Sequence, residues 1–435
     1  MASKKLVAAW WLCALGLVGA CKSSPCDAPR DICKIEDRSC QSTILALTAC
    51  QWGSDIDTLP PMRVITQQKF RDELVAQAKA DGTQQTPWDG AFMQLGLLAA
   101  GQDANAASID ETVKSIAAYY DNGTKDITII DASMSDDPLS RMYVLSHELT
   151  HYLQDRTLNL SAVSKRIERN FDSHMALSSL VEGDAIVTST RVYAGWKHFA
   201  IGNINWEAFF SGMEDDTVMQ IEASKTPLFV ARQSLPYYVG GRYIERIWDE
   251  QGRDQVDALY TKPQTHSIDW YTNNAGASLA RSPACAPPLA PQGLVLYGWD
   301  ELGPAGLLAF FAANGGGLDA AEKDSVEQLT GDAFAVYAKT TDKAAPATPI
   351  SVAWRLRFPS AEIAATVAAQ IMADRAAVTV TSADNEVLIT ATDTPASAFS
   401  DAALASCPSF DSLGAPAKTD SMASSAVRPR ELPRQ

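Results

Sequence analysis

Apolar positions along the first half of the chain alternate between extended and helical spacing, which predicts a mixture of short strands and helices. Extended runs at 63–66 and 126–130 predict strands, and the second follows a turn at Asp121, Asn122 and Gly123. Helical spacing predicts three helices between these strands, at 67–80, 91–100 and 109–120.

Two longer helices are predicted next. Asp137 followed by Pro138 favours a helix start, because Asp can cap free backbone N–H groups and Pro fits the first helical position. This helix should run to about Arg156. A second helix is expected from Ser173 to about Tyr193, with apolar residues on more than one face, as in a buried element. The two are expected to pack together.

The last third of the chain has a different pattern. A proline-rich stretch at 281–291 predicts a hinge, an apolar helix is expected around 305–313, and mixed β-like and helical runs fill 350–391. These features predict a smaller C-terminal α/β unit. From Gly414 onwards there is no hydrophobic period, so a disordered tail is expected.

Composition and charge narrow the class of protein. The 435 residues are 46% hydrophobic and 20% charged, which is typical of a folded globular protein too long for one ordinary core. The net charge is -16, and no block of Lys and Arg alternates with aromatic residues. Nucleic acid is therefore not expected as a partner.

The N-terminus has the pattern of an export signal. Lys4 and Lys5 precede an apolar stretch at 6–18 that is too short to span a bilayer. It ends in Val18-Gly19-Ala20-Cys21, which resembles the bacterial lipoprotein box and implies a lipid anchor on Cys21 in a bacterial membrane. Lys22 after the anchor favours the outer membrane. The alternative is an ordinary secretory signal with a cysteine nearby.

Of the eight cysteines, Cys13 falls in the signal and Cys21 in the box, which leaves six for the exported protein. An oxidising compartment favours up to three disulfides among them, with a pairing that spacing does not determine. The alternative, a structural zinc knot, needs short C-x-x-C steps that are absent. The six are Cys26, Cys33, Cys40, Cys50, Cys285 and Cys407.

These patterns divide the chain into five parts. They are a lipoprotein signal peptide at 1–20, a cysteine-rich tether at 21–60, a main α+β domain at 61–280, a C-terminal helical and α/β region at 281–411, and a disordered tail at 412–435.

The motif with the clearest chemistry is His147-Glu148-Leu149-Thr150-His151, which matches H-E-x-x-H. Four residues on a helix bring both imidazoles to one face, close enough to bind one zinc ion. Glu148 would project towards the open coordination position and act as the catalytic base for a water molecule that the metal activates. Apolar flanking residues indicate that this helix is buried.

A third zinc ligand is predicted on the next helix. Glu182 lies among apolar residues, where an uncompensated carboxylate costs several kcal/mol, so binding a dication would explain its presence. Gly183 after it would allow helices to approach closely. The alternatives for Glu182 are a surface carboxylate or a salt bridge to an Arg such as Arg191.

These motifs together resemble a bacterial group of gluzincin-type metallopeptidases over roughly residues 62–390. The resemblance rests on Tyr119-Tyr120-Asp121, Asp126 to Ile130, Leu145 to Asp155, Glu182-Gly183-Asp184-Ala185, Leu235 to Gly241 and Asp300 to Gly303. It implies a zincin-like metallopeptidase core and an edge strand at Thr128 to Ile130 that pairs with an extended substrate. Thermolysin-like members carry an Asp four residues after the ligand Glu, where this chain has Ile186. Asp184 is expected to face another way, so the residue that orients a histidine stays unassigned.

The resulting hypothesis is a zinc-dependent envelope peptidase that acts on proteins or peptides. Tyr237 or Tyr238, and also Arg242, are candidates for stabilising the oxyanion if their segment returns over the cleft. His174, His198 and His266 are expected to be structural or exposed. The alternatives are a non-catalytic zincin-fold binding or scaffold lipoprotein, and hydrolysis of a non-peptide envelope polymer. Glu148 favours catalysis because a metal ligand set alone does not need it.

Overall fold

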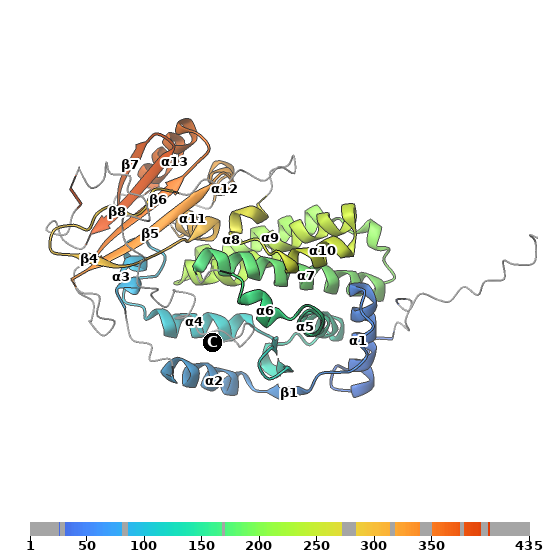
Figure 1. Cartoon of the computed structure of the whole chain (residues 1–435). Coiled ribbons are helices and arrows are strands. Elements are labelled where there is room, and N and C mark those ends of the chain that lie inside the picture. The colour runs from blue at the N-terminus through green and yellow to red at the C-terminus, as the bar shows by residue number, and fades with distance from the viewer. Residues whose placement is uncertain are drawn as a thin grey trace, which may run out of the picture.

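The structure, a computed structural model, describes residues 26, 31–80, 86–167, 170–271, 284–313, 318–339, 350–374, 378–392 and 399–400. It is mainly helical with two small sheets (Figure 1), which confirms the mixed α+β class. The helices are α1 (Arg38–Trp52), α2 (Gln67–Ala80), α3 (Pro87–Gln94), α4 (Ala104–Ser115), α5 (Pro138–Leu158), α6 (Leu160–Ser164), α7 (Phe171–Trp196), α8 (Trp206–Ala223), α9 (Pro227–Gln251), α10 (Arg253–Thr261), α11 (Gly303–Ala312), α12 (Ala320–Glu327) and α13 (Ala361–Asp374). The strands are β1 (Met62–Ile65), β2 (Ala118–Asp121), β3 (Asp126–Ile130), β4 (Val295–Asp300), β5 (Gly331–Ala338), β6 (Ser351–Arg357), β7 (Thr379–Ala383) and β8 (Glu386–Thr392). Short 3-10 turns lie at η1 (Asp131–Ser133), η2 (Ile201–Asn203) and η3 (Ser267–Trp270).

The first sheet has the order β1-β3-β2, with β1 parallel and β2 antiparallel to β3. The turn between β2 and β3 is held by the Asp121 carboxylate, which accepts hydrogen bonds from the backbone of Gly123 (2.7 Å) and Thr124 (3.2 Å). The helix predicted at 109–120 is wrong at its end, because Ala118–Asp121 pairs with β3 instead. Backbone pairing across this hairpin overrides a local apolar spacing that also fits a helix.

The predicted edge strand is also wrong. β3 lies between β1 and β2, so its backbone groups are already paired on both sides. Among the described residues, β2 pairs only with β3 and therefore has one unpaired side. The sequence pattern of Thr128 to Ile130 carries no information about which neighbours the strand acquires.

The helix predicted at 91–100 lies earlier in the structure, as α3. It begins at Pro87, where Thr86 and Asp89 form a capping box, and it ends at Gln94 shortly before Gly96, whose φ is +70°. The apolar residues beyond it are buried in a turn. α2, α5 and α7 occupy the segments predicted to be helical, and the Asp137 side chain caps α5 by accepting a hydrogen bond from the Ser140 backbone (2.9 Å).

The cysteine-rich segment contains a helix that the sequence analysis did not predict. α1 packs against α5 and α7 at one end of the helical body (Figure 1). Disulfides join Cys26 to Cys50 and Cys33 to Cys40, and Cys285 is also disulfide-bonded. Cysteines in disulfides offer no thiolates to a metal, so the zinc-knot alternative is wrong for these five residues.

The long helices α7 and α9 cross at glycines. An ideal Cβ on Gly183 of α7 would lie 2.3 Å from the carbonyl carbon of Gly240 in α9. A Cβ on Gly240 would lie only 1.8 Å from the carbonyl oxygen of Ser179. The expectation that Gly183 allows a close helix approach is therefore confirmed, and the approach holds Glu182 in a buried position.

The second sheet is antiparallel throughout, with the order β4-β5-β6-β8-β7, and it lies at the other end of the helical body (Figure 1). Its core continues into the helices, because Phe334 of β5 stacks on Trp88 and Phe92 of α3 at ring-centroid distances of 5.8 and 5.9 Å. One hydrophobic core thus crosses residue 281. The predicted boundary there stays a prediction.

Several predictions concern residues outside the described ranges. These are the signal at 1–20, the lipidation site Cys21, residues 281–283 of the hinge, Cys407 and the tail at 412–435. Among the described helices, none combines the length and the apolar character that a bilayer crossing requires.

Candidate metal centre

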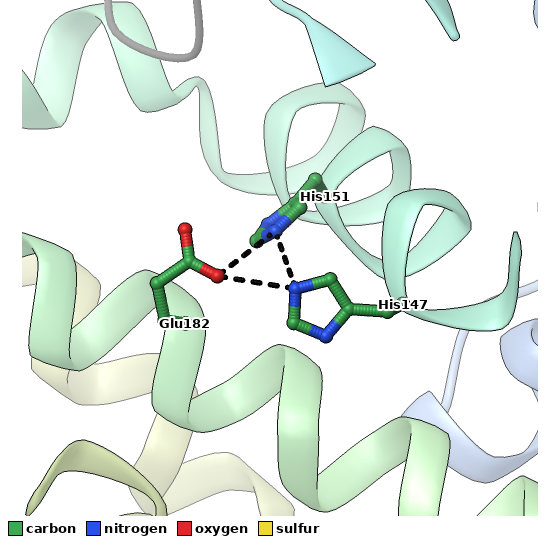
Figure 2. A group of neighbouring side chains, drawn as sticks. All are labelled: His147, His151 and Glu182. Carbon is green, nitrogen blue, oxygen red and sulfur yellow. Dashed lines mark hydrogen bonds and ion pairs between the residues drawn. The ribbon is translucent and has the colours of Figure 1, made fainter. Parts of the chain in front are cut away.

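Two helices bring three potential metal ligands together in the protein interior. His147 and His151 lie one turn apart on α5, and Glu182 faces them from the adjacent helix α7 (Figure 2). The Nε2 atoms of the two histidines are 3.1 Å apart. The Oε2 atom of Glu182 lies 3.1 Å from Nε2 of His147 and 3.4 Å from Nε2 of His151. All three side chains are buried.

The geometry and the donor types of this group fit a zinc ion. Protein ligands about 2.0–2.1 Å from zinc in a tetrahedron lie about 3.3 Å from one another, and the three measured separations are close to that value. Two imidazole nitrogens and one carboxylate oxygen leave a fourth position for water or substrate, as in catalytic zinc sites. The group can therefore bind a metal ion, whose identity the geometry does not specify.

The charge of Glu182 suits this role. Burial by itself would raise the pKa of its carboxyl group, but the neighbouring imidazoles of His151 and His147 outweigh burial and lower that pKa below its usual value. Glu182 is therefore ionised at neutral pH and available as an anionic ligand.

Glu148 lies beside the same group without belonging to it. Its side chain is 5% exposed, and burial raises its pKa although His147 and His151 oppose that shift. The backbone N–H of Tyr120 in β2 donates a hydrogen bond to this carboxylate, while its Oε2 atom has no hydrogen-bond partner among the described residues. A buried carboxylate oxygen without a partner, next to a metal-ligand set, is suited to exchange a proton with a bound molecule.

The orientation of His151 depends on Gln154, which the sequence analysis did not single out. Oε1 of Gln154 lies 2.9 Å from Nδ1 of His151, so this contact directs Nε2 towards Glu182. The amide nitrogen of Gln154 donates to the carbonyl oxygen of Val181 (3.0 Å) and to Oδ2 of Asp184 (3.1 Å). A polar residue three positions after a ligand, on the buried face of the motif helix, is a signal that could have identified it.

Asp184 also belongs to this supporting network, which corrects the expectation that it faces away from the centre. It does not touch a histidine but acts through Gln154. Its buried carboxylate pairs with both terminal nitrogens of Arg253 and accepts hydrogen bonds from Trp52 (3.1 Å) and Tyr260 (2.9 Å). Burial would raise the pKa of Asp184, but Arg253 outweighs it and keeps the carboxylate ionised.

We expect Gln154→Leu to weaken metal binding by roughly 10- to 100-fold, because His151 loses the partner that orients its ring. Leu keeps a similar volume, and Asp184 keeps its contacts with Arg253, Trp52 and Tyr260. Competition with a chromophoric chelator measures the affinity. Gln68→Leu, on the exposed surface of α2, is the matched control and should bind metal like the parent. An unchanged affinity in Gln154→Leu would show that the contact does not position His151.

The candidates for oxyanion stabilisation are separated by the fold. Tyr237 stacks on His147 with a ring-centroid distance of 5.7 Å, so it borders the centre. Tyr238, the next residue of α9, is buried in a pocket that none of the three metal-group residues lines. Arg242 lines that pocket too, where it pairs with Glu214 (3.3 Å). The oxyanion role of these residues stays a prediction.

The other histidines named above differ in their surroundings. His266 is buried and forms part of a second group of potential ligands, described below, whereas His198 is exposed. His174, on α7, belongs to neither group of potential ligands found among the described residues.

Comparisons with known proteins identify no relative. No protein-family model, no curated protein and no solved structure matches this chain significantly.

Proposed function

We propose that this protein is a zinc-dependent metallopeptidase of gluzincin type. The observation that carries the proposal is the convergence of His147, His151 and Glu182 on one point, with the carboxylate of Glu148 buried beside them. A structural metal site has no need of a buried carboxylate that is not itself a ligand. Hydrolysis, by contrast, requires a protonatable carboxylate that lies beside the metal ligands, and Glu148 is such a group.

When bound, zinc would polarise the scissile carbonyl group and make a water molecule acidic enough to attack it. His147, His151 and Glu182 would hold the ion, and their burial keeps bulk water away from the reacting atoms. Glu148 would take the proton from the attacking water and pass it to the leaving amine. Its raised pKa brings it closer to neutral pH, where both proton transfers are efficient.

The unpaired side of β2 supports peptide as the substrate class. The carbonyl groups of Ala117 and Asp121 accept hydrogen bonds from the residues of the β3 hairpin, whereas the N–H of Tyr120 points to Glu148. An extended peptide that paired with this side of β2 would therefore pass next to the catalytic base. This proposal replaces the edge strand expected at Thr128 to Ile130.

The envelope location is part of the same proposal. The lipoprotein box that ends at Cys21 and the two disulfides near the start of the described chain are consistent with export to an oxidising compartment. We propose that a lipid on Cys21 anchors the enzyme to a bacterial membrane, with the outer membrane favoured by Lys22.

The first experiment is metal removal from the purified full-length protein. Chelation should abolish cleavage of an unfolded protein substrate, and stoichiometric zinc should restore it, because the Lewis acid and the acidified water are both lost with the ion. Cleavage is followed by gel electrophoresis and mass spectrometry of the products. Cleavage that persists without metal would contradict the proposal. Bound zinc with no cleavage of any peptide would favour the non-catalytic scaffold.

A further inference from the structure

A second group of potential metal ligands lies at the start of α7. Asp172 comes from the first turn of this helix, His266 from the residue before η3, and Glu301 from the residue after β4. Asp172 and Glu182 are ten positions apart on this helix, which corresponds to about 15 Å along the axis. This group is therefore distinct from the centre that contains His147.

The three side chains are arranged so that their donor atoms face one another. One ligand atom from each lies within 4.8 Å of the other two. Nε2 of His266 is 3.5 Å from Oε2 of Glu301. His266 is only 9% exposed, and its Nδ1 atom contacts the hydroxyl of Thr265 at 2.8 Å. That contact occupies one ring nitrogen and leaves Nε2 directed at the carboxylates.

Two neighbouring buried carboxylates, Asp300 and Asp332, lie outside this group of potential ligands. The Asp300 carboxylate accepts hydrogen bonds from the backbone of Phe171 and Glu301, both within 2.9 Å. The Asp332 carboxylate accepts from the backbone of Leu302 and Gly303 at the start of α11, and from the indole of Trp354. Backbone N–H groups satisfy these two acids, which join the sheet to the helix starts.

The Asp172 carboxylate is buried at the start of α7, where it accepts hydrogen bonds from the backbone N–H (3.1 and 3.2 Å) and the hydroxyl of Ser267. Among the described residues, no Lys or Arg forms an ion pair with Asp172, Asp300 or Asp332. A buried carboxylate without a cationic partner, together with a buried imidazole and a second carboxylate, is a donor set that a divalent ion can complete.

We propose that Asp172, His266 and Glu301 form a second site for a divalent transition metal ion, separate from the catalytic centre. The imidazole favours zinc, manganese or iron(II) over calcium and magnesium, which prefer oxygen ligands only. The site has a structural role: it ties the start of α7 to the segment before η3 and to the link between β4 and α11. α7 carries Glu182, so the second ion would stabilise the helix on which the catalytic centre is built.

The test is a metal count on variants of the full-length protein, saturated with zinc and then freed of loosely bound ions. The parent should hold two zinc ions per chain, one for each group. His266→Gln and, separately, Glu301→Gln should each hold one, and should still cleave substrate if the proposed function is right. His151→Gln should also hold one, but at the other site. His198→Gln, at an exposed histidine, is the matched control and should keep both ions.

Other outcomes separate this proposal from the proposed function. If His266→Gln and Glu301→Gln bind as much zinc as the parent, the second site does not exist. If the parent holds a single ion that only His151→Gln removes, the group at Asp172, His266 and Glu301 binds no ion and the proposal is wrong. A second ion that both variants lose, in a protein that never cleaves a peptide, would support this site and contradict the peptidase. Circular dichroism of each variant establishes that it is folded.

Discussion

Glu148→Gln is expected to reduce peptide-bond hydrolysis by about 1000-fold or more while the protein still binds its metal. Glutamine has the same size and can still accept the hydrogen bond from the Tyr120 backbone, but its amide cannot take a proton from water. General bases typically contribute about 100- to 10,000-fold to a rate. The measurement is the rate of cleavage of an unfolded protein, with metal content determined on the same sample.

The control is Glu250→Gln, which makes the same chemical change at an exposed position of α9 and should leave the rate unchanged. If Glu148→Gln keeps more than about a tenth of the parent rate, Glu148 is not the base. If the variant loses its metal as well, the experiment would show that Glu148 supports the ligand set. Full activity loss with full metal retention separates the two roles.

Gly240→Ala is expected to destabilise the protein by about 3 kcal/mol or more, or to prevent folding altogether. The added Cβ would lie 1.8 Å from the carbonyl oxygen of Ser179, and backbone atoms cannot yield as a flexible side chain can. α7 and α9 would have to separate, and Glu182 and Tyr237 lie on these two helices. Denaturant unfolding followed by circular dichroism measures the loss.

Gly212→Ala is the matched control, because Gly212 also lies within a helix, α8, and nothing lies within 4 Å of its Cβ position. Alanine favours helix over glycine, so this variant should be as stable as the parent or up to about 1 kcal/mol more stable. A Gly240→Ala protein with the stability of the parent would mean that the two helices do not cross as closely as described.

The hydrogen-bond network that orients His151 could not be predicted from local sequence patterns. Ile186, at the position where thermolysin-like chains have an orienting Asp, left that role unassigned. The structure fills it with Gln154 and Asp184, together with Arg253 from α10 and Trp52 from α1. These four residues come from four different helices. No spacing along the chain relates them, because their contacts depend on how the helices pack.

The elements that the sequence predicted well are those whose causes are local. Asp137 caps α5, and Pro138 occupies its first turn, both within a few residues of the helix they start. The turn at Asp121 to Gly123 is likewise held by its own side chain. The end of α4 was predicted incorrectly because Ala118–Asp121 becomes a strand only through pairing with β3, and the local apolar spacing does not show this pairing.

The sequence by itself determined the two histidines on one helix face, the carboxylate between them and the acid on the next helix, since helical geometry relates residues four apart wherever the helix lies. Tertiary structure alone decided that Glu182 meets both histidines, that Gln154 and Asp184 support them, and that His266 joins two acids. It also decided that β3 is central in its sheet. The physical reason is that these relations are set by packing and strand pairing between distant segments, which backbone periodicity does not encode.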